Sequence, residues 1–283
     1  MRRVAERSAG TRRVERVMGI PVAIDGDGDV EGAFAWLRWV DATFSTYRVD
    51  SEISRIDRGE LAARDAHPLV RHVLGRCERL RRATRGYFDA RAGGRLDPSG
   101  LVKGWAAERA WRIAGGGCVD AGGDVRVGGR PYRVGVRHPH EPGALAAVVR
   151  LRDGAVATSG AYERGTHIVD PHTGRPPRGV LSVTVVAPDL ATADAYATAA
   201  FAMGAGAAAF LARATAMIVL EGDRVLTTPS FDALTAAPAG AALASAPPTA
   251  ALTAGAFTAA PPSGAVTAAR PTAAGRRGSP SGR

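Results

Sequence analysis

The spacing of apolar residues along the chain predicts several helices. Phe34, Leu37 and Val40 recur every three residues between positions 30 and 44, which places them along one face of a helix. Between positions 68 and 83, Val70, Val73 and other apolar residues form a similar stripe. The predicted helices span residues 30–44, 68–83, 101–113, 192–203 and 206–213.

Short runs rich in β-branched residues predict strands around these helices. Residues 17–24 alternate between apolar and polar positions and stop at a turn-forming Asp-Gly-Asp-Gly sequence. The later runs are separated by short turns, which is typical of hairpins rather than of regular β-α-β units. We therefore predict an α+β fold with mixed or antiparallel sheets and packed helices. The later strands are predicted at 117–120, 132–136, 146–151, 155–158, 166–169, 180–187, 216–220 and 224–227.

Composition divides the 283 residues into three parts. Residues 232–283 consist mainly of Ala, Pro, Thr, Gly and Ser, and such a segment buries too little apolar surface to offset its ordering entropy. We predict that this tail is disordered. Residues 1–16 are rich in arginine and are predicted to form a basic, flexible N-terminus. The folded domain is then expected to span residues 17–231.

Charge and cysteine content exclude several classes of function. The net charge is +10, but no aromatic residues interleave with the terminal arginines, so nucleic-acid binding is not predicted. Two cysteines are too few for a disulfide scaffold or a thiolate metal cage. The chain has no apolar run of about 18 residues and no apolar signal segment near its start, which predicts a cytoplasmic protein without a membrane span.

Lysine usage singles out one position. Lys103 is the only lysine among the 37 lysines and arginines. In a chain whose other basic residues are all arginines, a lysine indicates a position that the broad, planar guanidinium of arginine does not fit. Chance is the alternative explanation.

A glycine-rich segment, residues 88–104, leads into the helix predicted at 101–113. Unpaired N–H groups and the positive end of a helix dipole suit a phosphate group. The spacing of Gly100, Lys103 and Gly104 matches neither a Walker loop nor a Rossmann fingerprint. A purely structural turn remains an alternative.

Two further segments carry candidate chemistry. His167 and Asp170 flank a predicted strand end, where they are candidates for catalysis or for a hydrogen-bonded turn, and their spacing does not suit zinc. Asp194 and Thr198 lie four residues apart on a predicted helix, so their oxygens share a face that suits Mg²⁺. The alternative is that Thr192 caps this helix and Asp194 favours its N-terminus.

Taken together, these motifs resemble the FAD:protein FMN transferases, the ApbE family. The resemblance covers about residues 17–228, nearly the whole predicted domain. The motifs that carry it are Val17-Met18-Gly19, residues 44–47 and 50–55, Asp97 to Gly104, Asp120 to Asp124, Ala157 to Gly160, His167 to Asp170 with Thr173-Gly174, and Ala193 to Thr198.

The resemblance implies an enzyme with a T-fold-related single domain that binds FAD and Mg²⁺. It implies transfer of the FMN half to a Thr or Ser hydroxyl of an acceptor flavoprotein, with release of AMP. By the same resemblance, Asp194, Thr198 and the main-chain oxygen of Gly100 bind the metal, and His167 assists catalysis. The implied flavin-nucleotide contacts are Met18, Tyr47, Arg91, Ala92, Gly93, Asp97, Lys103 and Val169. Ile20 and Arg91 depart from the family pattern, which often has Thr at these positions.

Two alternatives remain at this point. An FAD diphosphatase would use the same metal and phosphate site, with water in place of the acceptor hydroxyl. A non-catalytic carrier of covalent FMN would need an Asp-x-x-(Ser/Thr)-Gly-Ala-(Thr/Ser) motif, the motif expected of the acceptor partner. This chain has Ser159-Gly160-Ala161 but continues with Tyr162, which argues against the carrier.

Overall fold

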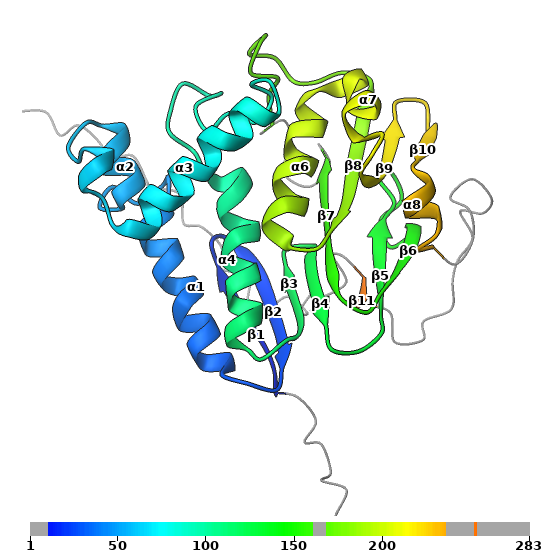
Figure 1. Ribbon diagram of the computed structural model, residues 1–283, viewed down its shortest axis with the longest axis horizontal. Helices are drawn as coiled ribbons and strands as arrows, with labels where there is room; N and C mark the ends of the chain where they lie inside the picture. Colours follow the sequence, from blue (N-terminus) through cyan, green and yellow to red (C-terminus); the bar gives the residue numbers. More distant parts are fainter. Residues whose placement is uncertain (1–10, 161–167, 236–251, 254–283) are drawn as a thin grey trace, which may run out of the picture.

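An eight-stranded antiparallel sheet forms the centre of the protein (Figure 1). We describe it from a computed structural model, in which residues 11–160, 168–235 and 252–253 are described. The strand order is β1-β2-β3-β4-β7-β8-β9-β10, and all neighbouring strands run antiparallel. The strands are β1 (Thr11–Val17), β2 (Ile20–Gly26), β3 (Gly117–Ala121), β4 (Asp124–Gly128), β7 (Gly154–Gly160), β8 (Val180–Ala187), β9 (Thr215–Leu220) and β10 (Val225–Thr227).

Helices cover one face of this sheet (Figure 1). The helices α1 (Val30–Phe44), α4 (Ser99–Ile113) and α6 (Leu190–Ala202) lie side by side and bury the larger of two apolar cores against the strands. The remaining helical segments are α2 (Glu52–Asp57), η1 (Ala63–Asp65), α3 (Pro68–Ala83), η2 (Gly204–Gly206), α7 (Ala207–Leu211) and α8 (Pro229–Asp232).

A small second sheet packs on the opposite face. It contains β5 (Tyr132–Arg137), β6 (Leu145–Leu151) and β11 (Leu252–Thr253). Side chains alternate along β9 between the two cores: Ala216 and Ile218 belong to the helix side, whereas Met217 and Val219 belong to the second core. The central sheet is therefore buried on both faces, and the predicted α+β class with antiparallel sheets is confirmed.

The N-terminal strand prediction is wrong in one respect. Residues 17–24 do not form a single strand, because β1 and β2 are joined by a two-residue hairpin at Met18 and Gly19. Both residues have positive φ values, 54° and 73°, which is the geometry that two-residue hairpins favour. The predicted flexible segment 1–16 is accordingly too long, since residues 11–16 belong to β1. Residues 1–10 lie outside the described residues.

Most other predicted elements are present. The bounds of α1 and α3 agree with the predicted 30–44 and 68–83. The helix predicted at 206–213 is divided between η2 and α7. In the strand predicted at 166–169, Ile168 and Val169 are not extended into a strand, and the other two residues lie outside the described part. The elements that the pattern did not predict are β1, α2, η1, β4, α8 and β11.

The C-terminal boundary lies later than predicted. The backbone N–H of Arg150 donates to the carbonyl of Leu234 at 2.8 Å, and Thr235 forms a bridge with Val149. The folded chain therefore continues beyond residue 231, because residues 232–235 complete the edge of β6. Within the predicted tail, β11 pairs in parallel with β5, and the remaining residues from 236 onward lie outside the description.

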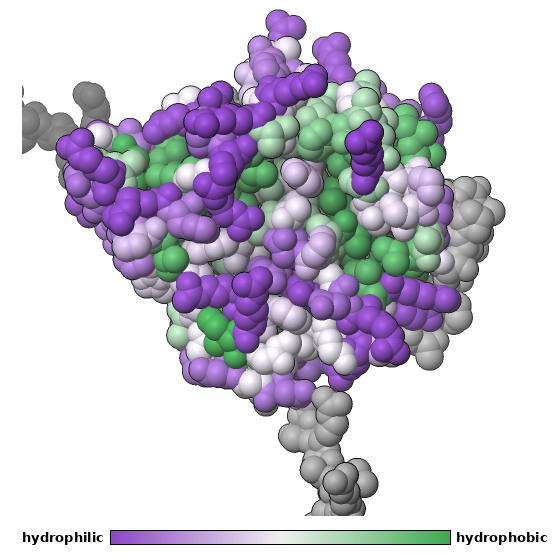
Figure 2. Space-filling model, viewed as in Figure 1, coloured by the Kyte–Doolittle hydropathy of each residue, from purple (hydrophilic) through white to green (hydrophobic). Residues whose placement is uncertain are grey.

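The face seen in Figure 2 is a mosaic of hydrophilic and hydrophobic residues, with a pale green area over α7. In the described ranges, no helix is long and apolar enough to cross a bilayer.

Candidate functional site

The site is built where α4 and α6 cross at close range. A Cβ atom at Gly104 of α4 would lie 2.5 Å from the carbonyl oxygen of Leu190 and 2.8 Å from Cβ of Asp194. Only glycine permits this approach, because real Cβ atoms do not come so close to backbone. The N–H of Gly104 donates to Oδ2 of Asp194 at 3.0 Å, which ties this carboxylate to α4.

Lys103 lies between two buried carboxylates. Its Nζ atom is 2.5 Å from Oδ2 of Asp124 and 3.5 Å from Oδ1 of Asp194. Asp124 begins β4, is 2% exposed, and accepts a hydrogen bond from the N–H of Thr158 on β7 at 3.1 Å. A single ammonium group therefore links α4, α6 and the central sheet.

The surroundings of Asp194 shift the pKa of its carboxyl group strongly. Burial raises the pKa of its carboxyl group to about 7, and the neighbouring charge of Asp124 adds to the rise. The Lys103 ammonium and the Gly104 N–H act in the opposite direction by stabilising the carboxylate. A further cation at Asp194 would favour the charged form in the same way.

Thr198 extends the site by one helical turn. Its hydroxyl lies 3.4 Å from the hydroxyl of Ser159 on β7. A Cβ atom at Gly100 would lie 3.2 Å from Cγ2 of Thr198, so the first turn of α4 passes directly beside this threonine. The structure thus brings Gly100, Asp194 and Thr198, the three predicted metal ligands, to the facing sides of two helices.

These residues suit Mg²⁺ better than zinc. In the described part of the chain, no three His, Cys, Asp or Glu side chains gather into a metal cage. A carboxylate, a hydroxyl and a main-chain carbonyl are hard oxygen donors, and Mg²⁺ completes its shell with water and substrate phosphates. The buried carboxylate of Asp194 is the charged group around which such a site would form.

The alternative interpretation of this helix start is wrong. The N-cap of α6 is Asp189, not Thr192, and its carboxylate accepts hydrogen bonds from the N–H and the hydroxyl of Thr192 at 3.0 and 2.7 Å. Asp194 is the fifth residue of α6, beyond the first turn, so a favourable interaction with the helix N-terminus does not account for its position.

The predicted nucleotide contacts lie on the segments that lead to α4. Asp97 accepts a hydrogen bond from the N–H of Ser99 at 2.9 Å and so shapes the start of this helix. Arg91 is exposed, and its guanidinium lies 3.5 Å from the carboxylate of Asp57 in α2. Ala92 is half-buried and Gly93 is exposed.

The other predicted contacts are more scattered. Tyr47 follows α1 and is 95% exposed. Met18 is half-buried at the N-terminal hairpin, and Val169 is half-buried after the segment 161–167. His167, the predicted catalytic residue, lies outside the described residues.

Two residues of the site, Asp124 and Ser159, have no role predicted from the sequence. Asp124 and Ser159 lie within the motifs at 120–124 and 157–160, which is the signal that could have identified them. The thiols offer no further chemistry, because burial raises the pKa of both Cys77 and Cys118 to about 12.

One known protein family matches most of the chain. The ApbE family model matches residues 18–96 and 90–220, which is most of the described chain. The chain belongs to the ApbE family. The matched ranges include Lys103 with its two carboxylate partners, Asp124 and Asp194, and the other two predicted metal residues, Gly100 and Thr198.

Curated ApbE-type relatives match parts of the chain. An FAD:protein FMN transferase of Rhodobacter capsulatus is 48% identical over 94 residues, 29% of this chain and 18% of that protein. One from Treponema pallidum is 38% identical over 143 residues, 41% and 40% of the two chains. One from Escherichia coli K12 is 32% identical over 163 residues, 48% and 46% of the two chains. The matched stretches thus span less than half of each relative.

Solved structures share the fold over a longer range. The ApbE protein of Thermotoga maritima superposes with a TM-score of 0.73 at 25% identity, over 80% of this chain and 99% of the other. The flavin transferase ApbE of Vibrio cholerae gives a TM-score of 0.70 at 22% identity, over 79% and 98%. The described architecture is therefore that of the ApbE family.

Proposed function

We propose that this chain is a Mg²⁺-dependent FAD:protein FMN transferase. Family membership and the names of the curated relatives support the activity. The observation that carries the proposal is the crossing of α4 and α6, which places Gly100 beside Thr198 and holds the buried Asp194 against Gly104 and Lys103.

In the proposed reaction, an acceptor Thr or Ser hydroxyl oxygen forms a bond to the phosphorus of the FMN half of FAD. The bond from that phosphorus to the bridging diphosphate oxygen breaks, and AMP leaves with the oxygen. His167 would accept the hydroxyl proton, a role typically worth about 10²–10⁴ in rate. When bound, Mg²⁺ neutralises negative charge on the diphosphate oxygens.

Different parts of the chain would bind the diphosphate and the metal ion. The N-terminal end of α4 offers a positive helix dipole to the diphosphate. Lys103 adds a compact positive charge one turn further along α4, next to the predicted ligand Asp194. Asp194 and Thr198 would hold the metal by oxygen atoms on one face of α6.

The test is incubation of the protein with FAD, Mg²⁺ and an acceptor flavoprotein, followed by intact mass and AMP measurement. We expect an FMN adduct on the acceptor and one AMP per adduct. AMP with free FMN and no adduct would instead identify an FAD diphosphatase.

Asp194→Asn tests the metal assignment because the change removes charge at nearly constant volume. We expect Mg²⁺ affinity to fall by more than the roughly 10–100-fold typical of outer-shell changes, with most transfer lost. Asp65→Asn, at an exposed position in η1, is the matched control and should behave as the original chain. Full activity of Asp194→Asn at limiting Mg²⁺ would refute the assignment.

The nature of the acceptor partner and the cellular location of this protein are inferred from the sequence alone. The proposed acceptor carries the Asp-x-x-(Ser/Thr)-Gly-Ala-(Thr/Ser) motif, and a cytoplasmic location stays a prediction.

A further inference from the structure

The helices α4 and α6 run antiparallel and meet at intervals of one helical turn. Gly100 faces Thr198, and Gly104 faces Asp194. A step of four residues forward along α4 therefore corresponds to a step of four residues back along α6. These two levels of contact contain the three predicted metal ligands. One further step leads to position 108 of α4 and to the first residue of α6.

At this third level, a buried carboxylate joins the two helices. The N–H of Leu190, the first residue of α6, donates to Oε2 of Glu108 at 3.0 Å. Glu108 is 6% exposed. At the level before it, the N–H of Gly104 donates to the carboxylate of Asp194, also at 3.0 Å. Each helix thus uses one carboxylate to bind a backbone N–H of the other, and the two bonds lie one turn apart.

Glu108 supplies a partner that the start of α6 lacks. The first N–H groups of a helix have no acceptor within the helix. The N-cap Asp189 accepts the N–H of Thr192, and Glu108 accepts the N–H of Leu190. A carboxylate is also favoured beside the positive end of a helix dipole. The start of α6 is therefore held on α4 by Glu108.

Arg126 of β4 fixes the carboxylate of Glu108 in turn. Its Nε atom donates to the same Oε2 atom at 2.9 Å, and its guanidinium lies over the ring of Trp111, 3.7 Å from the centroid. The other oxygen, Oε1, accepts from Arg112 at 3.1 Å, and the Arg112 side chain is 67% exposed. A single oxygen of Glu108 therefore accepts both buried bonds, and an amide oxygen in its place could do the same.

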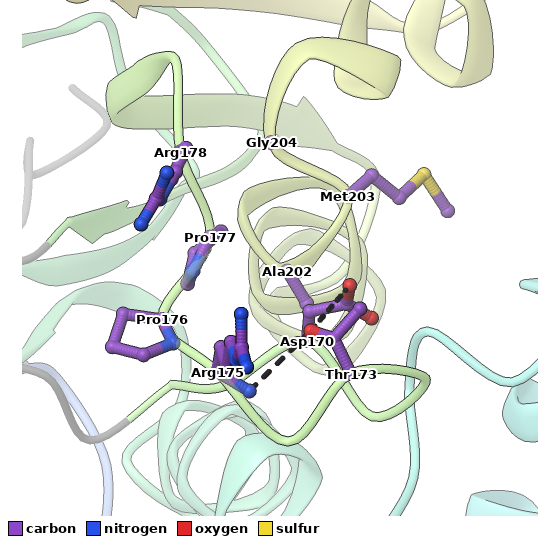
Figure 3. Close-up of a pocket in the computed structure, with 9 residues that line it drawn as sticks. All are labelled: Asp170, Thr173, Arg175, Pro176, Pro177, Arg178, Ala202, Met203 and Gly204. Carbon is purple, nitrogen blue, oxygen red and sulfur yellow. Dashed lines mark hydrogen bonds between the residues drawn. The ribbon is translucent and has the colours of Figure 1, made fainter.

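Figure 3 shows the other end of α6, where Ala202 and Met203 line a pocket of about 460 Å³ beside the segment that precedes β8. Within the described ranges, the hydrogen bonds between α4 and α6 lie at Leu190 and Asp194, in the first half of α6. The helix is thus tied to α4 near its start and borders open space at its end, so the contacts near its start set its position.

We propose that Glu108 is a positioning residue for the metal site. It holds the first turn of α6 on α4 and thereby places Asp194, one turn later, against Gly104. Glu108 itself lies about 12 Å along α4 from Gly100, so it acts through Asp194 rather than by contact with FAD or the metal. The role of the metal in this inference rests on the proposed function.

Two variants separate the hydrogen bond from the charge. Glu108→Gln keeps an oxygen for Leu190 and Arg126. The double variant Glu108→Met/Arg126→Met removes this acceptor together with the buried ion pair, an exchange for apolar residues that is often neutral for stability. Val149→Ala is the control, because Val149 is fully buried in the second core, across the sheet from both helices. Urea denaturation verifies that each variant folds.

The first measurement is the NMR signal of the Gly104 amide, which needs no FAD, metal or acceptor. Lys103 is the only lysine and directly precedes Gly104. Labelling lysine carbonyls with ¹³C and glycine nitrogens with ¹⁵N therefore leaves one amide signal in an experiment that correlates the two. Hydrogen bonds to carboxylates are strong, so we expect this amide proton downfield. Asp194→Ala gives the reference position for an amide that has lost its partner.

We expect Glu108→Gln and Val149→Ala to keep the Gly104 signal of the original chain. The double variant should move this signal toward that of Asp194→Ala. An unchanged signal in the double variant would overturn the proposal. A shift of the same size in Glu108→Gln would overturn it too, because the charge and not the bond would then act. The same shift in Val149→Ala would indicate general loosening of the fold and would also count against a positioning role.

A further variant decides the question if the double variant does not fold. Glu108→Asp keeps the charge but shortens the side chain by one methylene group, so its carboxylate cannot reach both Arg126 and Leu190 unless α6 moves. The Gly104 signal should then move, and an unchanged signal would overturn the proposal.

The second measurement links this position to the metal. FAD is titrated at a series of Mg²⁺ concentrations. The Mg²⁺ concentration that gives half of the effect should rise at least tenfold in the double variant and stay unchanged in Glu108→Gln. An unchanged Mg²⁺ requirement in the double variant would overturn the role in the metal site.

Failure of the proposed function gives a different pattern. If both measurements agree with expectation but no FMN adduct forms on any acceptor, the positioning role is supported and the transferase function is refuted. If Mg²⁺ has no effect on FAD affinity in the original chain, the metal of the proposed function is refuted, while the Gly104 signal still decides whether Glu108 positions Asp194.

Discussion

Lys103 makes its closest described ion pair with a residue that the sequence did not assign to the site. Asp124 lies 2.5 Å from its ammonium group and is almost fully buried, while Asp194 lies 3.5 Å away. A compact ammonium fits between these two carboxylates, whereas a planar guanidinium needs more width. Composition alone had singled out this lysine, and the cluster supplies a physical reason for it.

Lys103→Arg should therefore weaken FAD binding by about tenfold, roughly 1.4 kcal/mol. The larger head group would displace Asp194 or the bound diphosphate, because neither carboxylate has free space around it. The measurement is an FAD titration with and without Mg²⁺. Arg64→Lys, an exchange at an exposed position, controls for the charge type and should leave FAD affinity unchanged. Unchanged affinity in Lys103→Arg would mean that arginine serves equally well at this position and that the single lysine has no special role.

Sequence spacing predicted part of this site for a clear reason. Asp194 and Thr198 share a face because a helix repeats every 3.6 residues, so their proximity follows from local structure. Asp124 and Ser159 approach the same cluster from β4 and β7. Their approach depends on how strands from different parts of the chain pair, which periodicity within one segment does not reveal.

Among the elements, the close crossing of α4 and α6 has the most direct consequence for the site. We expect Gly104→Ala to destabilise the protein by about 1–3 kcal/mol, because the new Cβ atom would press on the backbone of Leu190 and on Cβ of Asp194. Urea denaturation measures the change. Mg²⁺ affinity should fall as well, since Asp194 would move away from α4.

Gly75→Ala is the matched control for this variant. Gly75 lies in α3, where an added Cβ would meet only an arginine side-chain nitrogen at 3.6 Å. This change should be neutral or stabilise the protein by up to about 1 kcal/mol, through helix propensity. Equal effects of the two substitutions would show that helix propensity, rather than the helix crossing, decides the outcome at Gly104.

The elements also differ in how clearly the sequence predicts them. Helices α1 and α3 have one buried face, so their apolar stripe marks both ends. Strand β4 was missed because Arg126 interrupts it. Its guanidinium is buried, donates to Glu108 at 2.9 Å and stacks over Trp111 at 3.7 Å, a partnership that the local sequence does not show.

For the molecule as a whole, the two cores separate the proposed chemistry from the C-terminal elements. The α4–α6 crossing belongs to the helix side of the central sheet. Phe231 of α8 is fully buried in the second core, on the opposite face, together with residues of β5 and β6. Changes at the C-terminal end of the fold should therefore alter stability without altering the site.

Two truncations locate this C-terminal limit. A chain ending at Phe231 loses the backbone bond from Arg150 to Leu234, the contact of Leu234 with the second core, and Asp232, the last residue of α8. One hydrogen bond and one partly buried leucine are together worth about 1–3 kcal/mol, so its melting temperature should be roughly 2–8 °C below that of a chain ending at Thr235. FAD affinity should be the same in both, because the site lies across the sheet. Equal melting temperatures would place the limit at residue 231, where composition alone had put it.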